Sequence, residues 1–185
     1  MLSTNPRGLF GLLLLFVYCI NLAIASSLQP RQTDNSTNLC TTPPENDCSF
    51  YQECIETRYH CGPSGYPLGE GYKYCTKSLE ARSNLSPEGQ QWTTDAMLCL
   101  QEKLVPYASG SANVTCDELR DYAVGTHAKC YIENGWCRLP VSDWALVVSF
   151  VLPAFLGDPQ NVKSALETSQ GCAALYAWIV ITYFF

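Results

Sequence analysis

The chain has 185 residues, a formal net charge of −6, 47% hydrophobic residues and 11 cysteines. The acidic balance argues against a nucleic-acid-binding protein, because such a protein needs a basic surface to neutralise phosphates. The hydrophobic content is sufficient for a packed core, and the length fits one domain. The odd number of cysteines requires an explanation, because exported proteins usually pair their thiols.

Residues 1–25 have the features of a secretory signal peptide. Arg7 supplies a positive charge, Leu9–Ile20 is an apolar run, and Ala23–Ala25 offers small residues for cleavage. The alternative, a membrane anchor, is disfavoured because the run is shorter than the roughly 20 residues that cross a bilayer. Cleavage also removes Cys19 and leaves an even number of cysteines. The sequence therefore predicts a secreted, extracellular protein stabilised by disulfides.

The mature chain is predicted to start with a flexible leader, held near its end by Cys40, ahead of a helical domain. Residues 26–47 are polar, rich in Ser, Thr, Asn and Pro, and lack periodicity, whereas residues 48–185 carry helical patterns. Apolar residues recur at three- and four-residue spacing over 50–58, and Asp47 is a candidate N-cap. The Gly- and Pro-rich stretch 61–69 predicts turns that end this first helix.

Three helices are predicted in the middle of the chain, and two of them have clear start signals. The first covers 71–82. Ser86 is a candidate N-cap for the second helix, which continues towards Pro106. Residues 115–118 have the sequence of a capping box, and the helix that follows should continue to Gly135.

The last part of the chain predicts a short helix after Pro140 and two further helices at 158–167 and 171–185. No stretch of useful length shows the alternation of a strand. These patterns together predict an all-α, disulfide-rich bundle of about five to seven helices.

The chain ends in an apolar segment, Ala173–Phe185, which is too short to span a bilayer comfortably, so no stable membrane span is predicted. A glycolipid-anchor signal is the alternative, but processing near Gly171 would remove Cys172 and leave an odd number of cysteines. A retained helix could support a non-covalent homodimer. The apolar side chains expected to form that contact are Tyr176, Trp178, Ile179, Ile181 and Phe184.

The residues make no positive case for an enzyme. A small secreted hydrolase of phospholipase A2 type is the main catalytic alternative, and its chemistry needs a histidine base positioned by an aspartate. His60 and His127 are the two histidines, neither is followed by Asp, and each is predicted to occupy an ordinary polar helix position. Motifs of serine hydrolases, zinc proteases, nucleotide-binding loops and EF-hands are absent from the sequence, so no catalytic residue, metal or other cofactor is predicted.

Three N-glycosylation sequons lie in predicted loops, at Asn35, Asn84 and Asn113. They predict a glycoprotein. A secreted, non-enzymatic binding or signalling protein is expected to display a rigid surface to an extracellular protein partner. The sequence does not identify that partner.

The order and spacing of the ten remaining cysteines resemble the stanniocalcin family, and the resemblance covers about Cys40 to Ala177. The resemblance implies a secreted glycoprotein that acts as a hormone or local regulator, linked to calcium and phosphate homeostasis and to inhibition of extracellular proteases. The segments that carry it are Cys54-Ile55-Glu56, Cys61–Tyr66, Leu85–Gln90, Leu98-Cys99-Leu100, Cys116–Leu119 and Cys130-Tyr131.

The resemblance also implies a disulfide pairing, which spacing and periodicity alone do not choose. The implied pairs are Cys40–Cys54, Cys48–Cys75, Cys61–Cys116, Cys99–Cys130 and Cys137–Cys172. The family's further cysteine, which joins two subunits, has no counterpart between Cys172 and Phe185, so a covalent dimer is not expected. A secreted effector or cell-wall protein is the other function that the sequence leaves open.

Overall fold

A computed structural model describes residues 38–184, without the side chains of Phe155 and of several residues near the C-terminus. These residues belong to one compact unit and form helices and turns without any strand, which confirms the all-α fold. The predicted signal peptide 1–25 and residues 26–37 lie outside the described part. The helical elements are η1 (Tyr51–Glu56), α3 (Thr57–Tyr59), η2 (Tyr66–Tyr72), α4 (Lys73–Ala81), η3 (Arg82–Asn84), α5 (Pro87–Ala108), α6 (Cys116–Glu133), η4 (Trp136–Arg138), α7 (Val141–Gly157) and α8 (Pro159–Phe184).

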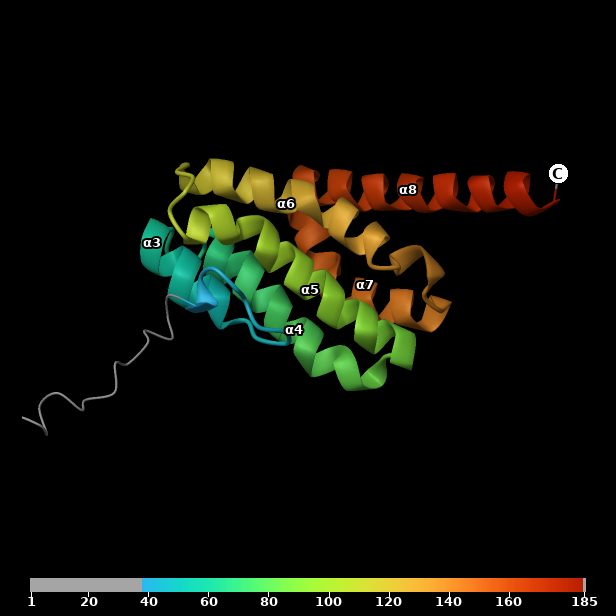
Figure 1. The fold of residues 1–185 in the computed structure, drawn as a ribbon, viewed down its shortest axis with the longest axis horizontal. Coiled ribbons are helices and arrows are strands. Elements are labelled where there is room, and N and C mark those ends of the chain that lie inside the picture. The colour runs from blue at the N-terminus through green and yellow to red at the C-terminus, as the bar shows by residue number, and fades with distance from the viewer. Residues whose placement is uncertain (1–37, 185) are drawn as a thin grey trace, which may run out of the picture. The chain divides into compact units, whose positions relative to one another are not determined.

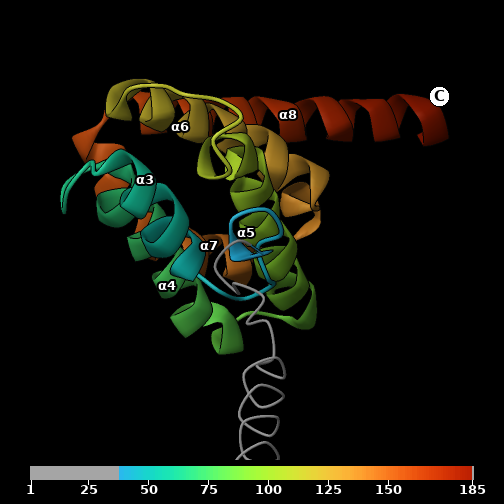
Figure 2. The same cartoon turned by 60° about the vertical axis from the view of Figure 1, so that its left-hand side comes forward.

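The helices pack around one interior region. Helix α5 lies beside α6, α6 lies along α8, and α7 packs against both α4 and α8 (Figure 1). The turned view shows α6 and α8 together on one side of the domain, across from α4 (Figure 2). Among residues 38–184, no helix combines the length and the apolar character needed to cross a membrane.

The described part of the predicted leader is fixed to the helical domain. Leu39 and Cys40 pack against the core that includes Phe50 and Ile55, and Pro43 is buried. Cys40 holds the end of the leader through a disulfide, as predicted, but the apolar contacts fix residues 38–47 as well, so this part of the leader is not flexible.

The first helix begins as predicted but has a different geometry. The Asp47 carboxylate accepts a hydrogen bond of 2.7 Å from the backbone N–H of Ser49, as expected of a cap. The segment Tyr51–Glu56 is a π-helix, and the chain leaves the helix at His60 in the left-handed conformation (φ 51°). Periodicity predicted a helix here but not its wider turn.

The prediction of turns over 61–69 is only partly correct. Residues 61–65 turn, but the π-helix η2 begins at Tyr66, five residues before the predicted start at Gly71. Burial of Tyr66 and Pro67 favours a helix despite the density of Gly and Pro. A Cβ atom on Gly71 would lie 2.5 Å from Cδ1 of Tyr51, so the glycine lets η2 pack directly on that ring.

The caps predicted for α5 and α6 are confirmed. The Ser86 hydroxyl accepts a hydrogen bond of 3.1 Å from the N–H of Gly89. At the start of α6, the Glu118 carboxylate accepts a 2.8 Å hydrogen bond from the N–H of Thr115, and the Thr115 hydroxyl accepts one from the N–H of Glu118. Helix α6 ends before Gly135, which has φ 102°.

The prediction of three shorter helices at the end of the chain is wrong. Helix α7 has 17 residues and contains Pro153, and α8 is one helix of 26 residues that includes Gly171. Gly171 does not break α8; it lies where α8 contacts α6. A Cβ atom there would be 2.2 Å from Cδ1 of Ile132, so glycine permits the close approach of the two helices.

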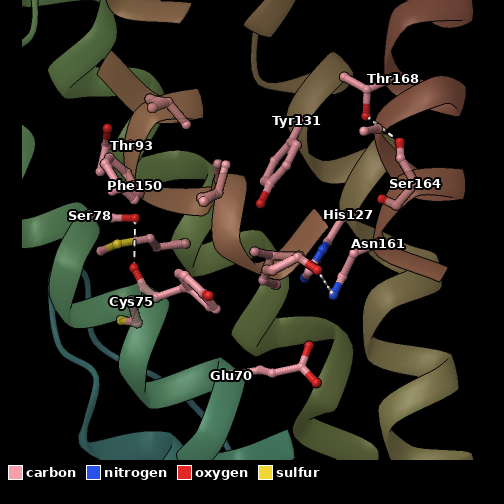
Figure 3. Close-up of a pocket in the computed structure, with 18 of the residues that line it drawn as sticks. Glu70, Cys75, Ser78, Thr93, His127, Tyr131, Phe150, Asn161, Ser164 and Thr168 are labelled. Atoms are coloured by element: carbon pink, nitrogen blue, oxygen red, sulfur yellow. Dashed lines mark hydrogen bonds between the residues drawn. The ribbon is translucent and has the colours of Figure 1, made fainter. Parts of the chain in front are cut away.

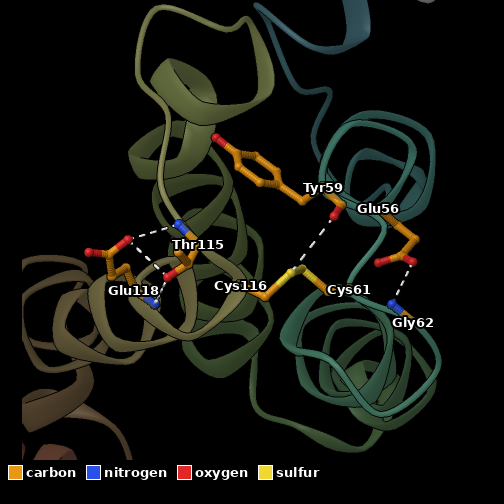
Figure 4. The surroundings of a disulfide bond; sticks show 7 residues. All are labelled: Glu56, Tyr59, Cys61, Gly62, Thr115, Cys116 and Glu118. Atoms are coloured by element: carbon orange, nitrogen blue, oxygen red, sulfur yellow. Dashed lines mark hydrogen bonds between the residues drawn. A yellow bond between two sulfur atoms is a disulfide. The ribbon is translucent and has the colours of Figure 1, made fainter.

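Five disulfides connect the elements, and they are the five pairs that the resemblance implies. Two of them hold the N-terminal segment. One joins α5 to α6 through Cys99–Cys130, and one joins η4 to α8 through Cys137–Cys172. The bond Cys61–Cys116 ties the turn after α3 to the start of α6, beside the hydrogen bond of 2.8 Å from the Gly62 N–H to the Glu56 carboxylate (Figure 4).

Candidate functional site

The strongest candidate site is a cavity of about 200 Å³ in the middle of the helical domain. Side chains from η1, η2 and helices α4 to α8 line it, so residues far apart in the sequence meet there (Figure 3). The cavity has an apolar side and a polar side, which come from different elements.

The apolar side consists mainly of aromatic and aliphatic residues. Helix α5 contributes Trp92, Ala96 and Met97, all buried, because their spacing places them on one face of the helix. The ring of Trp92 lies 4.8 Å from that of Trp136, centroid to centroid, and α7 adds Phe150 to this wall. This apolar face of α5 therefore forms both core and cavity wall.

The polar side comes from α6 and α8. His127 and Tyr131 lie one turn apart on α6, and their rings stack with centroids 5.6 Å apart. Helix α8 presents Asn161, Ser164 and Thr168, which recur at three- and four-residue spacing and are buried. Figure 3 shows these residues opposite Cys75 and Thr93.

Three of these polar groups, on His127, Tyr131 and Ser164, have no protein partner in the described part of the chain. The imidazole of His127 and the hydroxyl of Tyr131 make no hydrogen bond to any residue of 38–184. The Thr168 hydroxyl, by contrast, donates a 2.8 Å hydrogen bond to the carbonyl of Ser164. His127 and Tyr131 are half-buried and line the cavity, where a bound molecule can form hydrogen bonds with their unpaired polar atoms.

Burial keeps the side chains of His127 and Tyr131 uncharged at neutral pH. Desolvation, with a smaller effect of the nearby Arg120 charge, lowers the pKa of His127 to about 4. Burial raises the pKa of Tyr131 to about 12, and it raises the pKa values of Tyr51 and Tyr66 further. His127 is therefore a neutral donor and acceptor and a weak base.

The charge nearest the polar side is already paired. The Arg120 guanidinium donates 2.6 Å hydrogen bonds to Glu70, from η2, and to Asp158, at the turn between α7 and α8. A third hydrogen bond, of 3.0 Å, goes to the side chain of Gln160. Desolvation acts to lower the pKa of Arg120, but the two carboxylates outweigh it and raise that pKa. Glu70 is the acidic residue of this trio that also lines the cavity.

The two histidines have different surroundings, which the sequence did not distinguish. His60 is exposed at the end of α3, whereas His127 lines the cavity, so the expectation of an ordinary polar position is wrong for His127. The buried polar side chains of α8 were also missed. The helical spacing of Asn161, Ser164 and Thr168 could have indicated that they share one face. The helix was predicted to end at Glu167, however, which left Thr168 outside it.

The predicted surface residues that the structure describes are exposed. Asn84 and Asn113 lie at the surface, and the Arg58 guanidinium donates a 3.0 Å hydrogen bond to the side-chain oxygen of Asn113, while Asn35 lies outside the described residues. Of the residues predicted for self-association, Tyr176 and Ile181 are exposed, although the Tyr176 hydroxyl also donates to the carbonyl of Cys137. The side chains of Trp178, Ile179 and Phe184 lie outside the described part.

Large apolar side chains are exposed mainly on the last two helices. Within the described side chains, eight of the nine exposed large hydrophobic residues lie on α7 or α8, and the ninth is Tyr122 on α6. Such a concentration is typical of an interaction surface. The eight are Val141, Val148, Leu152, Leu156, Val162, Leu166, Tyr176 and Ile181.

Comparisons with protein-family models, with curated proteins and with solved structures found no match. Within residues 38–184, no three His, Cys, Asp or Glu side chains are grouped so as to hold a metal ion.

Proposed function

We propose that the chain is a secreted, stanniocalcin-like glycoprotein that regulates by binding another protein and not by catalysis. The observation that carries this proposal is the exposed apolar surface of α7 and α8, on which Leu152 is 43% and Leu166 is 57% exposed. Isolated apolar residues are normal on protein surfaces, but a concentration on two consecutive helices favours a protein contact. A role in calcium or phosphate balance follows from the resemblance alone.

Secretion is supported by two features of the described residues. Five disulfides are typical of proteins that fold in an oxidising compartment. The sequons at Asn84 and Asn113 are exposed, as glycan attachment requires.

Binding is favoured over hydrolysis by the surroundings of His127. A general base works best with a pKa near the operating pH, whereas burial lowers the pKa of His127 to about 4. We expect the protein collected from the medium to lack phospholipase activity, and replacement of His60 and His127 by Ala to change nothing in a lipid-hydrolysis assay. Hydrolysis that the parent performs and the His127→Ala variant loses would establish the hydrolase instead.

The partner proposed for the apolar surface is a second copy of the chain, in a non-covalent homodimer. Light scattering of the purified, oxidised protein should give the mass of a dimer, and Leu152→Ser combined with Leu166→Ser should give a monomer, because both changes place a hydroxyl in the contact. Tyr122→Ser is the matched control, since it changes an exposed apolar residue on α6, and it should remain a dimer. A monomeric parent protein would contradict the homodimer.

A further inference from the structure

The aromatic and the polar side chains of the cavity favour different chemical groups in a bound molecule. The aromatic side, with Trp92, Trp136 and Phe150, favours an apolar occupant, because water against such surface is unfavourable. The imidazole of His127 and the hydroxyl of Tyr131 also line the cavity and lack a hydrogen-bond partner among residues 38–184. The Tyr131 ring lies 5.4 Å from that of Trp92, so these polar groups adjoin the aromatic side. An occupant that satisfies both sides is mostly apolar and carries a hydrogen-bonding group.

The charges around the cavity select against an anion. Arg120 is the nearest cation described here, and its guanidinium is held by Glu70, Asp158 and Gln160. Glu70 also lines the cavity and would repel a carboxylate or phosphate. A neutral hydroxyl, in contrast, can donate to the imidazole of His127 or accept from the hydroxyl of Tyr131.

The size of the cavity and its contact with the surface limit the occupant further. An apolar cavity of about 150 Å³ is sufficient to hold benzene, and this one is about 200 Å³. The cavity therefore has room for one ring with a short substituent. Val148 and Ser169 line the cavity and are exposed, so the cavity reaches the surface beside α7 and α8 and a ligand can enter.

We propose that this cavity binds a small neutral molecule with an apolar ring and a hydroxyl group, of the size and chemistry of an alkylphenol or a cyclic alcohol. Its ring lies against the aromatic side, and its hydroxyl pairs with His127 and Tyr131 (Figure 3). The proposal goes beyond the protein contact proposed for α7 and α8, and Val148 belongs both to that surface and to the cavity opening.

The test is calorimetric titration of the oxidised protein at pH 7 with three probes that share one ring. We expect 4-ethylphenol to bind with one molecule per chain, ethylbenzene to bind about three- to tenfold more weakly because it lacks the hydroxyl, and 4-ethylbenzoate to give no detectable binding. Failure of 4-ethylphenol to bind at millimolar concentration, or equal binding of 4-ethylbenzoate, would overturn the proposal.

Two variants locate the binding site. Tyr131→Phe should weaken 4-ethylphenol binding about three- to tenfold and leave ethylbenzene unchanged, whereas the same change at exposed Tyr122 should affect neither. Ala165→Leu places a larger side chain in the cavity and should abolish binding of both compounds. Unchanged binding of 4-ethylphenol to Tyr131→Phe would overturn the proposal even if Ala165→Leu fails to fold.

Discussion

At the scale of single residues, His127 and Tyr131 distinguish this interior from an ordinary packed core. Their rings stack on one another, and their polar atoms face a cavity in place of a protein partner from residues 38–184. Both side chains are half-buried, so their polar atoms remain available to a molecule in the cavity. We therefore relate these two side chains to binding and not to packing.

Burial of His127 should make the protein less stable in acid. The folded state keeps this imidazole neutral down to about pH 4, whereas the unfolded chain takes up a proton near pH 6.5. Acid therefore favours the unfolded chain, and His127 should remove about 1.4 kcal/mol from the free energy of unfolding for each pH unit between these values. Below the lower value the loss is complete.

The measurement is chemical denaturation at pH 7, 5.5 and 4.5 for the parent and for His127→Gln. Carboxylates titrate in both proteins, so the difference between the two profiles isolates the histidine. The profiles should converge or cross as the pH falls, because only the parent loses this contribution. Parallel profiles would show that His127 is accessible to protons in the folded state.

Local residue roles could be predicted from sequence, but long-range ones could not. The caps Ser86 and Thr115 act on backbone groups three residues away, so their pattern is complete within a short segment. Asp143 is different, because it is buried and accepts hydrogen bonds of 3.1 and 2.5 Å from the backbone N–H and hydroxyl of Ser86. This contact joins the starts of α5 and α7 across 57 positions, and no local pattern indicates it.

At the scale of elements, the errors concern helices whose boundaries depend on partners. Gly and Pro predicted a turn up to residue 69, but burial of Tyr66 starts η2 earlier. Gly171 predicted a boundary within α8, whereas the contact with Ile132 explains the glycine inside one continuous helix. In both cases the residue type is explained by a neighbour that is distant in sequence, and tertiary contact overrides local propensity.

Glycines inside helices offer a matched test of this explanation. A Cβ atom on Gly71 would lie within 3.1 Å of three ring atoms of buried Tyr51, whereas a Cβ atom on Gly125 of α6 would meet no atom within 4 Å. Gly71→Ala should lower the free energy of unfolding by about 1–3 kcal/mol, because a packed ring must move. Gly125→Ala should raise it by about 0.5–1 kcal/mol, because alanine favours a helix.

Denaturation curves of both variants at one pH give the comparison. Equal effects of the two substitutions would contradict the packing of η2 on Tyr51.

At the scale of the molecule, disulfides join several of the elements that line the cavity. Cys99–Cys130 links the apolar wall of α5 to the polar residues of α6, and Cys137–Cys172 holds α8 against η4. Helical patterns and the number of cysteines predicted the fold class, but the pairing entered through a resemblance, because many pairings fit the same spacings. The cavity could not be predicted, because its lining comes from eight elements that meet only in the folded chain.

The central claim is that the chain is a secreted domain cross-linked by five disulfides. Its most direct test is peptide mapping of the non-reduced protein, collected from the medium of a secreting host. We predict a chain that lacks residues 1–25, carries glycans at exposed sequons, has no free thiol, and yields linked peptides for Cys99–Cys130 and the other four pairs. Retention of the protein inside the cell, or Cys99 and Cys130 in separate bridges, would contradict it.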